Sequence, residues 1–287
     1  MTALLEPFFY EYMRNAIGMS ALVGGLCAYL SCYLMLKGWS LIGDALSHAI
    51  VPGVVVAYML RIPLLFGAFV ASGLAVAALL LLDQRRGLKS DTVLGLIFIA
   101  LFGLGLFLVS ISPIPVDVQL LVKGNILSIS ASAAWQLVAV TGVTLLVLGS
   151  RQKDLLLVFF DASQARAQGL SPTRLRLLFF ALLAAACVAA MQTVGAFLVV
   201  ALVITPGATA YLLTNRFARL VQIALTLGIG SGALGAYLSY FMNGATGGLI
   251  VCLQTGIFVV VFLLAPQQGW LAQRRARLRS TEVSPNP

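Results

Sequence analysis

The sequence predicts an all-α integral membrane protein, built as a polytopic bundle of eight or nine transmembrane helices. Of its 287 residues, 61% are hydrophobic and only 9% are charged. Ordinary soluble domains are about 45–50% apolar and about 25% charged, so this chain has too little polar surface to cover a water-soluble globule. The apolar residues also gather in runs of about 20, the length that a helix needs to cross the hydrocarbon core of a bilayer.

Nine runs are long enough to span, and several are rich in glycine and alanine, as closely packed membrane helices are. They cover residues 17–36, 41–60, 64–82, 92–111, 131–149, 175–191, 194–213, 220–242 and 249–265. Only Gln192 and Thr193 separate the sixth run from the seventh, and Pro206 and Gly207 interrupt the seventh. A broken or re-entrant pair at this point would reduce the count to eight spans.

Basic residues orient the bundle, because cytoplasmic loops of membrane proteins are enriched in lysine and arginine. They follow the third, fifth, seventh and ninth runs and comprise Arg85, Arg86, Lys89, Arg151, Lys153, Arg166, Arg216, Arg219, Arg274, Arg275, Arg277 and Arg279. Because these positions alternate consistently, we place all of them in the cytoplasm together with the C-terminus. Nine spans would then put the N-terminus outside, and eight would put it inside.

The net charge of +9 therefore reflects membrane topology and does not predict nucleic-acid binding. We interpret residues 1–287 as one transmembrane domain whose basic end, 268–287, forms a disordered cytoplasmic tail. No G-x-x-x-x-G-K-[ST] phosphate loop occurs, so we expect no nucleotide-binding module in the chain. The N-terminus lacks the pattern of a cleaved signal peptide. All four cysteines lie in apolar runs and are expected to be buried small hydrophobic residues; they are Cys27, Cys32, Cys187 and Cys252.

The three tryptophans and the segment 112–130 lie at the predicted membrane boundaries. Trp39, Trp135 and Trp270 are near predicted span ends, where aromatic belts occur. Residues 112–130 lie on the outer side in this topology and could hold a short surface helix over 116–123.

The segment 151–176 on the inner side predicts a short cytoplasmic helix over 162–168, about two turns long. Asp161 is a good N-cap residue, with Gln164 three residues later as in a capping box. Gly169 is a good C-terminal stop, and Pro172 prevents continuation of the helix.

An aspartate and the only histidine of the chain interrupt the second run. Asp44 and His48 are four residues apart, so on a helix they lie one above the other on the same face. Ser40 and Ser47 extend this face into a polar stripe. Pro52 cannot donate to the carbonyl of His48, so we expect the helix to kink and to free that carbonyl. Ionisable residues at membrane depth are costly and usually face an interior cavity.

These residues leave three functions open. A carboxylate and an imidazole suit borderline divalent metals such as Mn²⁺, Fe²⁺ or Zn²⁺. Such a pair can also relay protons, or it can simply hold helices together. Two ligands are too few for a stable metal site, although a two-fold related partner would bring the number to four. A helical zinc protease, which needs H-E-x-x-H, is nearly excluded because the chain has one histidine.

The stretch LMLKGWSLIGDALSHAIVPGV resembles the signature of the manganese/zinc/iron family of ABC-transporter permeases, and is closest to its manganese/iron branch. Weaker similarities follow in the family's order: SDTVLGLIF, LLVKGNILSIS and VGAFLVVALVITPGATA. The likeness runs from about residue 10 to residue 266, nearly the whole chain. The chain departs from the family near its last span, where NGATGGLIV lacks the usual acidic residue and proline at Asn243 and Ala245.

The resemblance implies a fold similar to that of the vitamin B12 importer permease, in a bacterial inner membrane. It implies a metal path lined by Asp44 and His48, and by helix spacing Ser40 and Ser47 are candidates to line the same path. It also implies three partners: a second permease subunit, identical or paralogous, a cytoplasmic ATPase that hydrolyses ATP, and an extracytoplasmic metal-binding protein. The short cytoplasmic helix resembles the family's coupling helix, which is identified here by Asp161, Ala165, Arg166 and Gly169.

We therefore expect a permease subunit for divalent transition metals, Mn²⁺ or Fe²⁺ before Zn²⁺. This chain would catalyse no covalent reaction and would bind no cofactor apart from the transported metal. The main rival is an ion-coupled secondary transporter in which Asp44 and His48 relay protons.

Overall fold

The computed structural model describes residues 2–39, 42–62, 64–83, 90–111, 126 and 129–265, excepting the side chains of 2–4, 42–47, 64–65, 79–83, 90–91 and 94. Within these residues the chain folds into helices alone, which confirms the all-α prediction. The twelve helices are α1 (Thr2–Phe9), α2 (Glu11–Lys37), α3 (Ile42–Met59), α4 (Leu64–Asp83), α5 (Ser90–Ile111), α7 (Ala131–Ser150), α8 (Gln152–Phe160), α9 (Ala162–Ala167), α10 (Pro172–Val194), α11 (Ala196–Leu213), α12 (Phe217–Met242) and α13 (Thr246–Leu264).

Nine of these helices coincide with the nine predicted runs, in the same order. Over the described residues, α2, α7, α10, α11, α12 and α13 are each long and apolar enough to cross a membrane. The other three contain the shorter apolar stretches His48–Met59, Phe66–Ala78 and Gly95–Ile111. The sixth and seventh runs form separate helices, α10 and α11, because Gly195 between them adopts a φ of +84°. The prediction of a multi-pass membrane bundle is confirmed.

Two helices were not predicted from the sequence. Helix α1 precedes the first span, and α8 follows α7 after the single residue Arg151. The apolar residues of α8 are too few to span a membrane, but Leu155, Val158 and Phe159 recur at spacings of three and four and are all buried. Helix α8 is therefore a short amphipathic helix that packs its apolar face onto the bundle.

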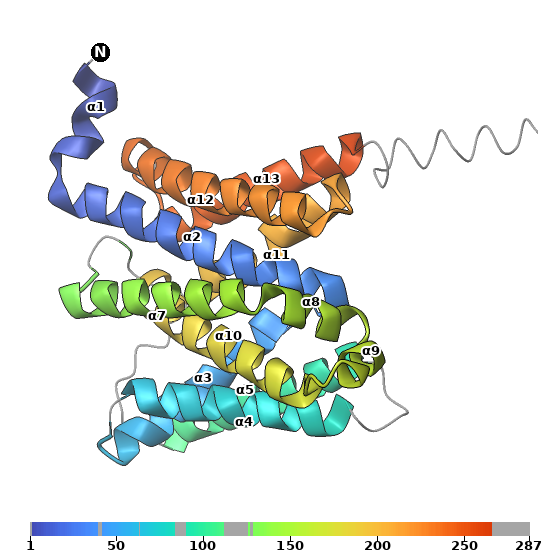
Figure 1. Ribbon diagram of the computed structural model, residues 1–287. Helices are drawn as coiled ribbons and strands as arrows, with labels where there is room; N and C mark the ends of the chain where they lie inside the picture. The colour runs from blue at the N-terminus through green and yellow to red at the C-terminus, as the bar shows by residue number, and fades with distance from the viewer. Residues whose placement is uncertain are drawn as a thin grey trace, which may run out of the picture.

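Helix α2 forms the centre of the bundle and crosses α12 at very short range (Figure 1). A Cβ atom added at Gly24 would lie 2.8 Å from the carbonyl carbon of Gly228, and one added at Gly228 would lie 2.7 Å from Cβ of Ala28. Small residues at such crossings allow two backbones to touch, which favours helix association in lipid.

Helices α8 and α9 lie at one end of the bundle, and α1 lies at the opposite end (Figure 1). The ring of Tyr33, near the end of α2, lies 6.1 Å from the ring of Phe159 in α8 and 5.1 Å from that of Phe217 at the start of α12. Lys37, Arg151 and Arg216 flank these contacts and therefore share one end of the molecule. This clustering agrees with the predicted cytoplasmic side.

Several predictions concern parts of the chain outside the described residues. These parts include the basic loop with Arg85, Arg86 and Lys89, the proposed surface helix over 116–123, and the tail 268–287 with Trp270.

Candidate functional site

Asp44, Ser47 and His48 of the predicted stripe fall within α3, which packs against both α4 and α5. Close backbone contacts hold α3 in place: a Cβ atom added at Gly53 would lie 2.8 Å from the carbonyl carbon of Gly67 in α4. On the other side, one added at Gly105 of α5 would lie 3.1 Å from Cδ of Pro52. Helix α3 is thus packed tightly near its proline, and it continues through Pro52 to Met59.

Asp44 and His48 both lie within α3, four residues apart, which confirms that one helix carries both residues. The side chains of Asp44 and Ser47, and the whole of Ser40, lie outside the described residues. Among the predicted site residues of this stripe, His48 is therefore the one whose surroundings the structure describes. Its side chain is partly buried.

The imidazole of His48 packs against two phenylalanines of α5 that the sequence analysis missed. Its ring centroid lies 4.8 Å from that of Phe98 and 5.0 Å from that of Phe102, with interplanar angles of 76° and 82°. The two phenylalanine rings are stacked on each other, 5.8 Å apart. The F-x-x-x-F spacing predicts that both rings share one face of α5, but the contact with α3 is tertiary and has no signal in the sequence.

This arrangement brings an imidazole into the bundle in a fixed orientation. Edge-to-face contacts with aromatic rings restrict rotation of the ring. Among the described side chains, no group of three or more histidine, cysteine or acidic residues comes together. Cys27, Cys32 and Cys187 are buried, as predicted, but Cys252 of α13 is exposed, so the prediction is wrong for that residue.

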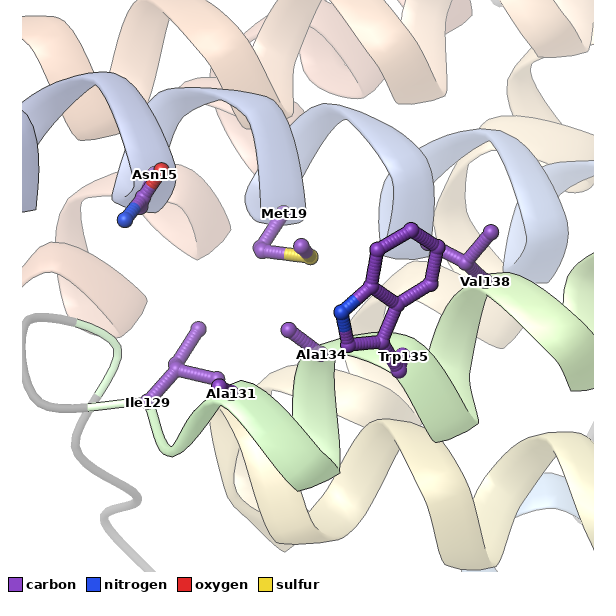
Figure 2. Close-up of a pocket in the computed structure, with 7 residues that line it drawn as sticks. All are labelled: Asn15, Met19, Ile129, Ala131, Ala134, Trp135 and Val138. Carbon is purple, nitrogen blue, oxygen red and sulfur yellow. The ribbon is translucent and has the colours of Figure 1, made fainter.

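Two grooves among the described residues lie away from His48. A groove of about 300 Å³ runs between α2 and α7 (Figure 2) and is lined by Asn15, Met19, Ile129, Ala131, Ala134, Trp135 and Val138. A neighbouring groove of about 400 Å³ shares Asn15 and Ile129 and adds Glu11, Tyr12 and Ile126. Both grooves open where α2 and α7 begin, at the end of the bundle opposite α9. Trp135 is 74% exposed, as expected for a residue of an aromatic belt.

The predicted cytoplasmic helix forms as α9. The Asp161 carboxylate caps it by accepting hydrogen bonds from the backbone N–H groups of Ser163 and Gln164, at 2.8 and 3.0 Å. The helix ends at Ala167, one residue earlier than predicted. Gly169 then adopts the left-handed conformation with a φ of +78°, and its N–H donates to the carbonyl of Arg166 at 3.0 Å. The cap and the glycine stop are confirmed, and Pro172 begins α10.

The residues of α9 differ in their exposure to solvent. Ala165 is fully buried, so it anchors the helix to the bundle. Arg166, Ser163 and Gln164 are exposed and form its outer face. Hydrogen bonds from the N–H groups of Gln164 and Ser163 lower the pKa of the exposed Asp161 carboxyl below its ordinary value.

Comparison with known proteins identifies the family. The model of the ABC 3 transport family matches residues 9–265. A probable iron transport system membrane protein of Haemophilus influenzae is 53% identical over 95% of this chain and 96% of its own length. YfeC, a chelated iron transport system membrane protein of Yersinia pestis, is also 53% identical, over 96% of this chain and 94% of its own. MntB, a manganese transport system membrane protein of Synechocystis, is 44% identical over 99% and 92%.

Solved structures agree with these sequence relatives. A chain of PsaBC from Streptococcus pneumoniae, in complex with Fab, superimposes with a TM-score of 0.83 at 31% identity, covering 97% of this chain and all of that one. An inward-facing putative metal-chelate type ABC transporter shares the fold, with a TM-score of 0.60 at 16% identity over 84% of each chain. The family match covers nearly the whole chain, and the fold follows it throughout. The protein belongs to the ABC 3 transport family.

Proposed function

We propose that this chain is the transmembrane permease subunit of an ABC importer for divalent transition metals, with manganese or iron as the favoured cargo and zinc as the third candidate. It is a multi-pass protein of the bacterial inner membrane. The names of its relatives support the class of cargo, because they describe iron and manganese transport. The single observation that carries the proposal is the position of Asp44 and His48 four residues apart in α3, with the His48 ring packed against Phe98 and Phe102 of α5.

In this proposal, Asp44 and His48 are the metal ligands of the path. A carboxylate oxygen and an imidazole nitrogen suit Mn²⁺, Fe²⁺ and Zn²⁺, whose selectivity then depends on geometry and supply. One chain contributes two ligands, so a second permease chain related by two-fold symmetry would complete a set of four. A small ligand set also favours transport, because a carrier must release its cargo. Ser40 and Ser47 would line the same path.

The energy for transport would come from partner proteins. The chain has no phosphate-binding loop, so ATP hydrolysis would take place on a cytoplasmic ATPase, and this chain would catalyse no covalent reaction. Helix α9 would receive the ATPase through its exposed face, including Arg166, while Ala165 anchors it and Asp161 and Gly169 define its two ends. An extracytoplasmic binding protein would deliver the metal. Alternating access then exposes the Asp44–His48 pair to one side of the membrane at a time.

Uptake by the reconstituted complex tests this function. The permease, its ATPase and its binding protein are placed in proteoliposomes, and uptake of isotopic Mn²⁺, Fe²⁺ and Zn²⁺ is measured with ATP. We expect Asp44→Ala and His48→Ala each to abolish uptake while the complex still assembles. Asp154→Ala, which removes a carboxylate from α8 outside the path, is the matched control and should retain uptake.

The same experiment separates the proposal from its rival. A proton-coupled transporter would accumulate metal in response to a pH gradient and would not need the ATPase. Uptake that survives removal of the ATPase would therefore reject the ABC importer. Normal uptake by both alanine variants would reject the metal-ligand assignment.

A further inference from the structure

Helix α9 is joined firmly to a buried phenylalanine of α8. Asp161 ends α8 and begins α9: its N–H donates to the carbonyl of Leu157 at 2.8 Å, and its carboxylate caps α9. Phe159 stands two residues before it and is 2% exposed. Ala165 is buried as well, so the helices on both sides of Asp161 are packed into the bundle.

Phe159 lies at the centre of an aromatic cluster formed by Tyr33, Trp39, Phe159, Phe179 and Phe180. Its ring centroid lies 5.1 Å from that of Phe179 and 6.0 Å from that of Trp39, both edge to face. Trp39 also contacts Phe180 at 5.3 Å. These contacts join α8 and α10 to the segment that leaves α2.

Trp39 occupies an unusual place for a tryptophan at a span end. It is 7% exposed, whereas the belt residue Trp135 is 74% exposed. The end of α2 fixes its backbone: Gly38 has a φ of +70°, and the N–H of Trp39 donates to the carbonyl of Leu34 at 3.0 Å, as in a Schellman motif. Helix α3 begins three residues later, and Asp44 is five residues away.

We infer that Trp39 and Phe159 are positioning residues that transmit the movement of α9 to α3, and so to the Asp44–His48 pair. Protein interiors are packed as densely as organic crystals, so rigid rings in contact pass on a displacement where a loose side chain would absorb it. Helices α8 and α9 form the part that would meet the ATPase, and Trp39 begins the segment that leads into α3. The contact between the rings of Phe159 and Trp39 links these two parts directly. This inference rests on the proposed function of α9 and α3.

A purely structural aromatic core would have a different consequence. Replacing one of its rings would lower stability and all activities together. If Trp39 and Phe159 instead transmit movement from α9 to α3, replacing either ring should leave ATP hydrolysis in place but uncouple it from transport. The informative quantity is therefore the amount of metal moved per ATP hydrolysed.

The test uses the complete complex in proteoliposomes, with Phe159→Leu, Trp39→Leu and the double variant. Phe258→Leu, from a stacked phenylalanine pair in α13, is the control. We expect Mn²⁺ uptake per ATP to fall about 2- to 10-fold in each single variant, the change that loss of one aromatic contact produces. The ATPase rate should stay within about twofold, and the double variant should be no worse than the poorer single variant, because both remove the same contact.

A second measurement does not depend on metal. Hydrogen exchange in α3 is compared with and without a non-hydrolysable ATP analogue. In the wild type, nucleotide should alter exchange in both α9 and α3. In Phe159→Leu and Trp39→Leu, the response of α9 should remain and that of α3 should disappear. If Phe159→Leu does not assemble, Trp39→Leu tests the same contact from the other side.

The outcomes distinguish the two proposals. Unchanged uptake per ATP in both single variants, or an α3 response that persists in them, would overturn the relay and leave the importer intact. A wild-type complex that moves no metal but whose α3 response requires Phe159 and Trp39 would reject the metal assignment and support the relay.

Discussion

The ring of His48 lies in edge-to-face contact with Phe98 and Phe102, and these contacts restrict how the imidazole can rotate within the bundle. The interplanar angles of 76° and 82° belong to the edge-to-face geometry that is favourable for aromatic pairs. Two rings on α5 thus hold one ring on α3. A ligand held in one orientation loses less conformational entropy when it binds.

Removing this aromatic contact should weaken metal capture without abolishing transport. Phe98→Leu and Phe102→Leu keep an apolar side chain but lose the ring. An aromatic pair contributes about 0.5–1.5 kcal/mol, so we expect the KM for Mn²⁺ uptake to rise about 2- to 10-fold in each variant. Phe107→Leu, on the same helix but with a 61% exposed side chain, should keep the wild-type KM. Equal changes in all three variants would contradict a specific role for the contact with His48.

The N-terminal end of α9, which Asp161 caps, should become less stable at acidic pH. Because hydrogen bonds from the N–H groups of Gln164 and Ser163 lower the pKa of Asp161 in the folded state, the carboxylate stabilises α9 above its unfolded pKa of about 3.9. That stabilisation is lost as the pH falls through the lower, folded pKa. Hydrogen-exchange protection of the Ser163 and Gln164 amides, corrected for intrinsic rates, should therefore be constant near neutral pH and fall below about pH 4.

The chain contains its own control for this measurement. Ser130 caps α7 by accepting from the N–H of Ala133, and a serine hydroxyl does not titrate in this range. Protection of Ala133 should not change over the same pH interval. In Asp161→Asn, which keeps an acceptor but cannot ionise, protection of α9 should also be independent of pH. A parallel loss in Asp161→Asn would show that another group titrates.

At the scale of elements, α11 receives hydrogen bonds from α2 beside its proline, Pro206. Pro206 lies inside α11 and lacks the N–H that would complete a helical hydrogen bond. The hydroxyl of Ser31 in α2 donates to the carbonyl of Ile204 at 3.3 Å and accepts from the N–H of Gly207 at 3.2 Å. A neighbouring helix thus provides hydrogen bonds at the weak point of α11, as membrane proteins require.

This contact leaves no room for a larger residue at position 207. A Cβ atom added at Gly207 would lie 2.9 Å from Cβ of Ser31 and closer still to its hydroxyl. Overpacking of this kind costs about 1–3 kcal/mol, so Gly207→Ala should lower the thermal midpoint of the detergent-purified protein. Gly142→Ala in α7, where an added Cβ meets nothing within 4 Å, should be neutral or stabilising. A midpoint unchanged in Gly207→Ala would show that α2 and α11 can move apart freely.

The same elements show what a sequence can predict. The nine long helices follow from apolar runs, and α9 follows from its cap and its glycine stop, because both signals are local. Helix α8 was missed because its nine residues are too few for a span, although Leu155, Val158 and Phe159 are buried. The contacts of His48 with α5 and of Ser31 with α11 join residues far apart in the chain. No local pattern encodes which helix faces which, so these parts of the site required the structure.

At the scale of the whole molecule, the proposed metal site would have only two ligands from one chain, Asp44 and His48. The bundle places α9 at one end, Asp44 and His48 on a helix within it, and an aromatic cluster between them. Among the described residues, His48 does not belong to any group of three or more histidine, cysteine and acidic side chains that could hold a metal ion. We therefore expect the functional unit to be a pair of permease chains that share one site on their two-fold axis.

A shared site predicts that one defective chain disables the pair. Two copies of the chain carry different affinity tags, one of them with His48→Ala, and the doubly tagged assembly is purified and reconstituted with its ATPase and binding protein. Loss of one of four ligands leaves an incomplete coordination shell, so Mn²⁺ uptake should fall to about a tenth of the wild-type value or less. Two independent sites would instead leave half of the uptake. The same assembly with Asp154→Ala in one chain controls for tagging and mixing and should transport normally. Uptake near one half in the His48→Ala assembly would place a complete site within each chain, and the search for its other ligands would then move to the side chains around Asp44.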